Sequence, residues 1–288
     1  MPTELPAGLA GRVHRAIDLL HAFMYFVPEA DEELTGIGLR PGRMGYFASR
    51  SAPMGPVSAG VTAATFYNFN PEIVARHIPR AWGLASIEDI LAARLRIADR
   101  ALRRLLGDEI AKAPAVAEAA ELTRAATFAL PTAGRPLYAG HAELDWPDEP
   151  HLALWHGATL LREFRGDGHV AVLLTAGVSG LDALITHTAT GRGFTEQAAK
   201  ATRGWSDEQW AAAVENLRGR GLLDDKGGLS DDGIEHRAVL EHATDELAAQ
   251  PWRTLGVDRS ERLIELGKAL SRHVVNAGAL SSDVFAGR

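Results

Sequence analysis

The chain has 288 residues, enough for one large domain or two small ones, and its 46% hydrophobic and 23% charged residues are the proportions of a globular protein. It contains no cysteine, which excludes disulfides, thiolate metal sites and a cysteine nucleophile and suits a reducing compartment, so we expect a cytoplasmic protein. No apolar run is long enough for a membrane, and the formal net charge of -7 gives no general attraction to nucleic acid.

Two helices frame the first part of the chain. From Arg12 to Phe26, apolar residues recur at spacings of four and three, as an amphipathic helix requires. Ser86 is placed to cap a second helix, acidic side chains follow in its first turn, and Gly107 is placed to end it. Between the two, prolines and glycines interrupt the helical pattern, and we expect short helices at about 57–68 and 71–81.

The middle of the chain predicts a connector followed by further helices. Residues 131–150 are rich in proline, glycine and acids, which indicates a surface loop or a lid. A helix is predicted from His151 to Arg165. Gly166 is expected to end it, and Asp167 is expected to cap the next helix, from Gly168 to Thr175.

The last hundred residues follow the order of a winged helix. A short helix from Glu196 to Thr202, a turn and a helix capped by Ser206 precede a glycine-tipped turn and a long helix from Ile234 to about Ala249. Strand signals are almost absent before this segment. We therefore expect a mainly α protein, with a helical ligand-binding domain at 1–190 and a winged-helix-like domain with a small β-hairpin at 191–288.

Residues of this segment carry a resemblance to known families. Residues 195–250 resemble a MarR-like winged helix, through Asn-Leu-Arg-Gly-Arg-Gly-Leu-Leu at 216–223 and Leu-Ser-Asp-Asp-Gly at 229–233. The whole chain looks like an actinobacterial helix-turn-helix family labelled SalK-like, a resemblance prompted by residues 63–69, 154–169 and 204–210. The resemblance implies a fold with the helix-turn-helix near the carboxyl end, and it implies little about chemistry.

The charges of the winged element argue against DNA recognition. Its second helix would enter the major groove by the amino-terminal end, where Asp207 and Glu208 lie, and the wing carries four aspartates against a single Lys226. Because phosphates repel carboxylates, we expect DNA binding to be disfavoured. Trp205 and Trp210 fit a packing surface instead, and a homodimer is one use of such a surface.

A polar cluster at residues 155–169 is the main candidate site. His156 and Glu163 are seven residues apart, which places them on one helix face, and glycines would let the backbone bring the following residues back beside Glu163. The alternative is ordinary ion pairs and helix caps. We expect acid–base roles for His156, Glu163 and His169. We expect ligand contacts from Tyr46, Arg50, Tyr67, Asn68, Trp155, Arg162, Arg165 and Asp167.

Nucleotide-binding, NAD-binding and zinc motifs do not occur in the sequence, so we expect no cofactor and no metal. The histidines at 141, 151, 156 and 169 match no standard metal spacing. We interpret the chain as a small-molecule-binding protein, with a cofactor-independent acid–base enzyme of specialised metabolism as its more specific form. The alternatives are a ligand-responsive MarR-like transcription regulator and a drug-sequestering protein.

Overall fold

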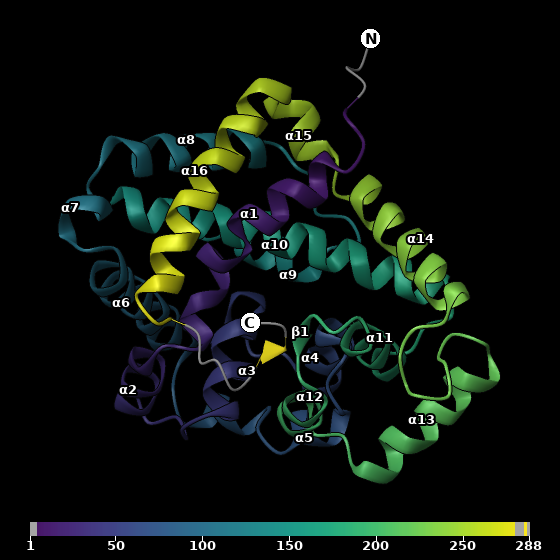
Figure 1. The fold of residues 1–288 in the computed structure, drawn as a ribbon. Helices are drawn as coiled ribbons and strands as arrows, with labels where there is room; N and C mark the ends of the chain where they lie inside the picture. Colours follow the sequence, from purple (N-terminus) through teal and green to yellow (C-terminus); the bar gives the residue numbers. More distant parts are fainter. Residues whose placement is uncertain (1–4, 280–284, 287–288) are drawn as a thin grey trace.

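The structure is a computed structural model that describes residues 5–279 and 285–286, and most of these residues are helical (Figure 1). The first part of the chain contains α1 (Leu9–Ala22), η1 (Phe23–Tyr25), α2 (Pro28–Gly36), α3 (Arg43–Ser51), η2 (Ala52–Met54), α4 (Ala59–Phe66), α5 (Pro71–Ala75), η3 (Arg80–Gly83), α6 (Ile87–Leu106), α7 (Asp108–Ala111), α8 (Pro114–Thr127) and α9 (Pro136–Ala142). The second part contains α10 (Pro150–Thr175), α11 (Gly180–Thr188), β1 (Gly193–Phe194), α12 (Glu196–Arg203), α13 (Asp207–Gly219), α14 (Asp231–Leu247), α15 (Gln250–Leu255), α16 (Val257–Asn276) and β2 (Phe285–Ala286). The predicted mainly α fold is confirmed.

The larger hydrophobic core forms around α10. Helices α1, α8, α9 and α14 pack on α10, and α16 lies along the other side of α1 (Figure 1). Trp252 of α15 and Leu263 of α16 belong to the same core as Leu9 and Val13 of α1. The last described helices therefore pack with the first part of the chain, and the division into 1–190 and 191–288 stays a prediction.

A second, smaller core joins α11, α12, α13 and the wing. Its buried members are Leu181, Leu184, Ile185, Ala199, Trp210, Leu217, Leu222 and Leu223. Ser206 and Gln209 form the capping box that opens α13, in which each side chain bonds the other residue's backbone N–H. The wing is reduced to one antiparallel bridge between Leu223 and Leu229, while β1 pairs antiparallel with β2. These elements form a helix-turn-helix unit, which we define as residues 180–229.

Two expectations about the middle of the chain are wrong. Residues 131–150 contain α9, whose Tyr138 and His141 are buried, so this segment is not simply a surface loop. Gly166 does not end a helix and Asp167 does not cap one, because α10 continues to Thr175. Packing on all sides of this buried helix outweighs the low helix propensity of glycine.

The sequence contains no apolar run long enough to cross a membrane, and the helices of the structure test this expectation. In the described part of the chain, no single helix is long and apolar enough to cross a membrane. Helices α10 and α11 satisfy that test only when taken together, and the pair is bent by 105°. Most of the α10 side chains lie inside the protein core, including those of His151, Leu154 and Phe164.

The segment after α4 connects the larger core to the helix-turn-helix unit. Tyr67 has a positive φ of 56°, and its phenol donates to the carbonyl of Val178 at 2.6 Å. A Cβ atom on Gly180 would lie 1.9 Å from the carbonyl oxygen of Tyr67, so only glycine allows this close approach. The Trp205 indole Nε1 donates to the carbonyl of Asn68 at 3.0 Å. Residues 67–70 therefore hold the start of α11 and the turn before α13.

Replacing Gly180 by alanine is expected to lower the free energy of unfolding by about 1–3 kcal/mol, since overpacking costs that much. The new Cβ atom would meet backbone atoms of Tyr67, which cannot move aside as a flexible side chain would. Gly36, in α2, faces open space and provides the control: Gly36→Ala should leave stability unchanged or slightly higher. Urea unfolding measures both, and equal stabilities of the two variants would contradict the close contact.

Candidate functional site

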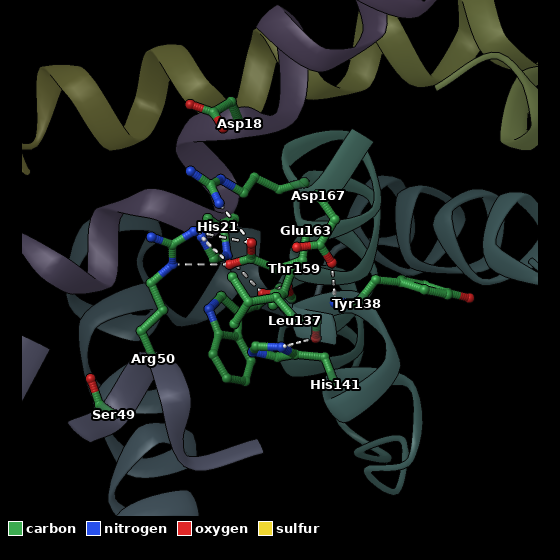
Figure 2. A network of polar contacts seen from close by, with 12 residues as sticks. Asp18, His21, Ser49, Arg50, Leu137, Tyr138, His141, Thr159, Glu163 and Asp167 are labelled. Carbon is green, nitrogen blue, oxygen red and sulfur yellow. Dashed lines mark hydrogen bonds and ion pairs between the residues drawn. The ribbon is translucent and has the colours of Figure 1, made fainter. Parts of the chain in front are cut away.

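The carboxylate of Glu163 is the centre of a buried ion-pair network (Figure 2). Arg50 of α3 donates from Nε to Oε1 at 3.2 Å and from Nη2 to Oε2 at 3.1 Å. Arg162 donates from Nη1 to Oε2 at 2.6 Å. Burial by itself raises the pKa of Glu163, but the charges of Arg162 and Arg50 together outweigh burial and hold the pKa well below its usual range. Glu163 is therefore an ionised carboxylate with both oxygens bonded.

His21 of α1 stands beside this ion pair as a neutral imidazole. The Thr159 hydroxyl donates to the carbonyl of Trp155, so its oxygen accepts from His21 Nδ1, 2.9 Å away. The other nitrogen, Nε2, lies 3.9 Å from Glu163 Oε1. Burial lowers the pKa of His21 well below its ordinary value despite the carboxylate nearby. The hydrogen bond to Thr159 thus fixes the tautomer and leaves Nε2 facing the network.

The network also includes Arg94, a buried arginine whose hydrogen-bond partners are a carbonyl and a histidine rather than a carboxylate. Arg94 of α6 is 1% exposed, donates from Nη1 to the carbonyl of Ser49 at 2.6 Å, and lies 3.3 Å from His141 Nε2 through Nη2. His141 Nδ1 donates to the carbonyl of Leu137 at 2.8 Å, so Nε2 is free to accept from the arginine. Burial, and then the charge of Arg94, lower the pKa of His141 to about 3. The network therefore holds more buried positive charge than negative charge.

Two cavities adjoin the network, one of about 970 Å³ and one of about 360 Å³. The residues that line both are His14, Asp18, Tyr46, Arg50, Phe69, Arg162 and Arg203. Three of these are arginines from α3, α10 and α12, and we call Arg50, Arg162 and Arg203 the arginine junction. Volumes of this size are typical of small-molecule sites, and the junction lies where the larger core meets the helix-turn-helix unit.

The structure brings a part of the predicted site together around these cavities. Tyr46, Arg50 and Arg162 line both cavities, and the Tyr46 hydroxyl accepts from Arg50 Nη1 at 3.1 Å. The predicted residues that line only the smaller cavity are Tyr67, Asn68, Glu163, Arg165, Asp167 and His169. Trp155 and His156 line neither.

The two outlying residues have an apolar environment of their own. The His156 ring meets the edge of Trp146 with centroids 4.7 Å apart, and its Nε2 is buried without a hydrogen bond. Burial, with the charges of Arg94 and Arg124, lowers the pKa of His156 to about 4. The Trp155 ring lies 5.5 Å from the Arg94 guanidinium. His156 and Glu163 thus share neither cavity, and the acid–base roles stay predictions.

Three α10 residues that line the smaller cavity, Arg165, Asp167 and His169, bond to neighbouring helices. Asp167 Oδ2 accepts from the backbone N–H of Tyr138 at 2.9 Å, and burial raises the pKa of Asp167 to about 6 (Figure 2). His169 Nδ1 lies 2.8 Å from the hydroxyl of Thr244, and burial lowers the pKa of His169 to about 4. Arg165 pairs with acidic side chains of α14 at 2.6 and 3.1 Å. Asp167 therefore fastens α10 to α9, and Arg165 and His169 fasten α10 to α14.

Sequence reasoning missed His21, Arg94 and Arg203. His21 continues the apolar stripe of α1 at four residues from Ile17, and Arg94 stands midway between Ile90 and Ala98 in the apolar stripe of α6. A polar residue inside an apolar stripe could therefore have marked His21 and Arg94 as buried site residues. Arg203, at the end of a polar helix, gave no such signal.

A family model described as a helix-turn-helix family matches residues 10–281. The chain belongs to this helix-turn-helix family. No curated protein and no solved structure matches the chain. The match covers the cavities as well as the helix-turn-helix unit, while the MarR-like and SalK-like resemblances stay predictions. The expectation that DNA binding is disfavoured is overturned by this membership, because the family is defined by a helix-turn-helix, a DNA-reading element.

The physical reason for that error is that formal charges were counted without their internal partners. Asp207 at the start of α13 accepts from Lys200 Nζ at 2.6 Å. Asp224 Oδ1 in the wing accepts from the backbone N–H groups of Lys226 and Gly228, both at 2.8 Å. Lys200 offsets the charge of Asp207, and backbone N–H dipoles surround Asp224, so these two acids repel phosphates less than their formal charges suggest.

Replacing Glu163 by glutamine is expected to lower the free energy of unfolding by about 3–5 kcal/mol, the usual cost of removing one partner of a buried ion pair. Both Arg50 and Arg162 would lose their anionic acceptor. Glu261→Gln is the control, because its pair with Arg12 is partly exposed to solvent and should cost less than about 1 kcal/mol. Chemical denaturation compares the two, and a cost for Glu163→Gln as small as that of the control would contradict the network.

Stability is expected to fall as the pH drops below about 6.5, the ordinary pKa of histidine. The pKa of His141 is about 3 and those of His156 and His169 are about 4 in the folded chain, so the unfolded chain binds more protons at these three positions between pH 4 and 6.5. Asp167, whose pKa is raised to about 6, has the opposite effect below pH 6 and offsets one of the three histidines. Each such histidine contributes ~1.4 kcal/mol per pH unit.

Urea midpoints at several pH values across this window measure the slope. His156→Leu should make the slope shallower, whereas His273→Asn, at an exposed position, should leave it unchanged. A midpoint that does not change between pH 7 and 5 would contradict the assignment of buried neutral histidines.

Proposed function

We propose that this protein is a transcription regulator that binds DNA through α12 and α13 and responds to a small molecule held in the two cavities. The observation that carries the proposal is the helix-turn-helix family match over residues 10–281. The position of the cavities adds support, since Arg203 of α12 and Phe194 of β1 line the larger one. A ligand there would touch the helix-turn-helix unit itself.

The exposed face of α13 suits the major groove in shape. Ala211 and Ala212 are exposed and small, which allows the helix backbone to come close to base edges. Asn216, also exposed on α13, carries an amide that can bond the two groove atoms of adenine. Arg192 and Lys226 are exposed and form no ion pair with the residues that the structure describes, so both are available for phosphates.

The cavity wall is bonded directly to the turn that precedes α13. The Asn70 amide Nδ2 donates to the carbonyl of Gly204 at 3.0 Å and lies 3.2 Å from Gln209 Oε1. Its backbone N–H donates to the carbonyl of Arg203 at 2.9 Å. The adjacent Phe69 lines both cavities. A ligand that shifts this wall would therefore shift the start of α13, which is how a ligand could change DNA affinity.

Selection of duplexes from a random DNA pool, followed by binding measurements over a salt series, tests the proposal. We expect a selected sequence that binds more tightly than random DNA and loses affinity as salt rises. Asn216→Ala should weaken binding to that sequence about tenfold and leave random DNA nearly unchanged, as loss of a base contact does.

Asn276→Ala is the matched control, because Asn276 is also an exposed helical asparagine but lies at the end of α16. It should bind like the wild type. Absence of any sequence-selective binding, even at low salt, would overturn the proposed function.

A further inference from the structure

Arg203 is the member of the arginine junction that the ion-pair network leaves without a carboxylate. Its Nη1 donates to Thr202 Oγ1 at 3.1 Å, whereas its Nε is buried without a hydrogen-bond partner. The guanidinium lies 4.5 Å from the ring centroid of Phe69 and 4.7 Å from that of Phe194. A buried donor without an acceptor costs free energy, so this position can gain from an anion that the chain does not supply.

The junction as a whole carries an excess of positive charge. The larger cavity is lined by five arginines, at positions 15, 43, 50, 162 and 203, against two carboxylates, Asp18 and Asp31. Glu163 lines only the smaller cavity, and its oxygens are already bonded to Arg50 and Arg162. Burial by itself raises the pKa of the Tyr46 phenol, but the charges of Arg50, Arg203 and Arg162 outweigh it and lower that pKa. The site therefore favours a negative group.

The larger cavity continues from the junction as a mostly apolar space. Its apolar lining residues include Leu19, Met24, Val27, Leu34, Phe69 and Ile97. Tyr25 also lines this cavity, and its hydroxyl is buried without a hydrogen-bond partner. An apolar wall with one cationic end suits a molecule with an apolar body and one acidic group.

We propose that the ligand is an organic acid whose carboxylate binds Arg203 opposite Arg50 and whose apolar body occupies the larger cavity. The proposal concerns the ligand class, and its regulatory consequence rests on the function proposed above. A planar guanidinium binds a carboxylate through two parallel hydrogen bonds, which the compact charge of a lysine cannot reproduce. The bound carboxylate would tie α12 to α3 and so fix the helix-turn-helix unit against the larger core.

Matched acids and amides test the ligand class on the full chain. The probes are naphthalene-2-carboxylate, 4-phenylbutanoate and decanoate, each compared with its primary amide by isothermal calorimetry. We expect at least one acid to bind about tenfold more tightly than its amide, the gain of charge-assisted hydrogen bonds. Three acids that bind no better than their amides would overturn the proposal.

Two substitutions locate the binding group. Arg203→Gln should reduce the affinity for that acid about tenfold and leave the amide unchanged, and Arg203→Lys should give an intermediate affinity. Arg220→Gln, at an exposed position of the same unit that lines neither cavity, should bind as the wild type does. Arg203→Gln removes an unpaired charge, so we expect it to fold with unchanged or higher stability. Full acid affinity in Arg203→Gln would overturn the assignment.

The test of the ligand class and the test of DNA binding can fail independently of each other. Acid binding that depends on Arg203, in a protein that selects no DNA, would retain the ligand class and reject the regulator. Selective DNA binding without any preference for acids over amides would retain the regulator and reject the ligand class.

Discussion

The ion pair between Glu163 and Arg50 is the constraint on which the rest of the site depends. A charge buried this deeply is tolerated only when opposite charges and hydrogen bonds surround it. Arg50 uses two of its nitrogens for the carboxylate, which fixes α3 against α10 and forms the wall that both cavities share. Glu163 is thus committed to structure, and the member of the arginine junction without a carboxylate partner is Arg203, at the boundary with the helix-turn-helix unit.

Local signals predicted much of the fold. Ser86 and Ser206 cap helices where the sequence placed them, because a cap needs only its own side chain and the next turn of backbone. The predicted break in α10 at Gly166 failed because burial along the helix is a tertiary effect. The position of α15 and α16 beside α1 likewise depends on long-range packing that periodicity does not contain.

The candidate site was predictable only where its residues are close in sequence or lie in an aromatic segment. Arg162 and Glu163 are neighbours, so their cluster was visible, and Tyr46 and Arg50 share one helix. Arg203 joins them only through the tertiary fold. The DNA expectation failed for a related reason, since internal partners of the acids are not visible in sequence. The acid–base enzyme and the drug-sequestering protein stay sequence predictions, and a carboxylate bonded to two arginines gives the first of them no support.

The central claim is that the arginine-lined cavity and the helix-turn-helix unit are coupled, so that an acid bound in the cavity changes the affinity of the unit for DNA. Thermodynamic linkage requires that an acid which changes DNA affinity has its own affinity changed by DNA to the same factor. The most direct measurement is DNA affinity with and without the bound acid, in the wild type and in Arg203→Gln. The account predicts a change of at least several-fold in the wild type and none in the variant. The same DNA affinity in the wild type at saturating and at zero acid would contradict it.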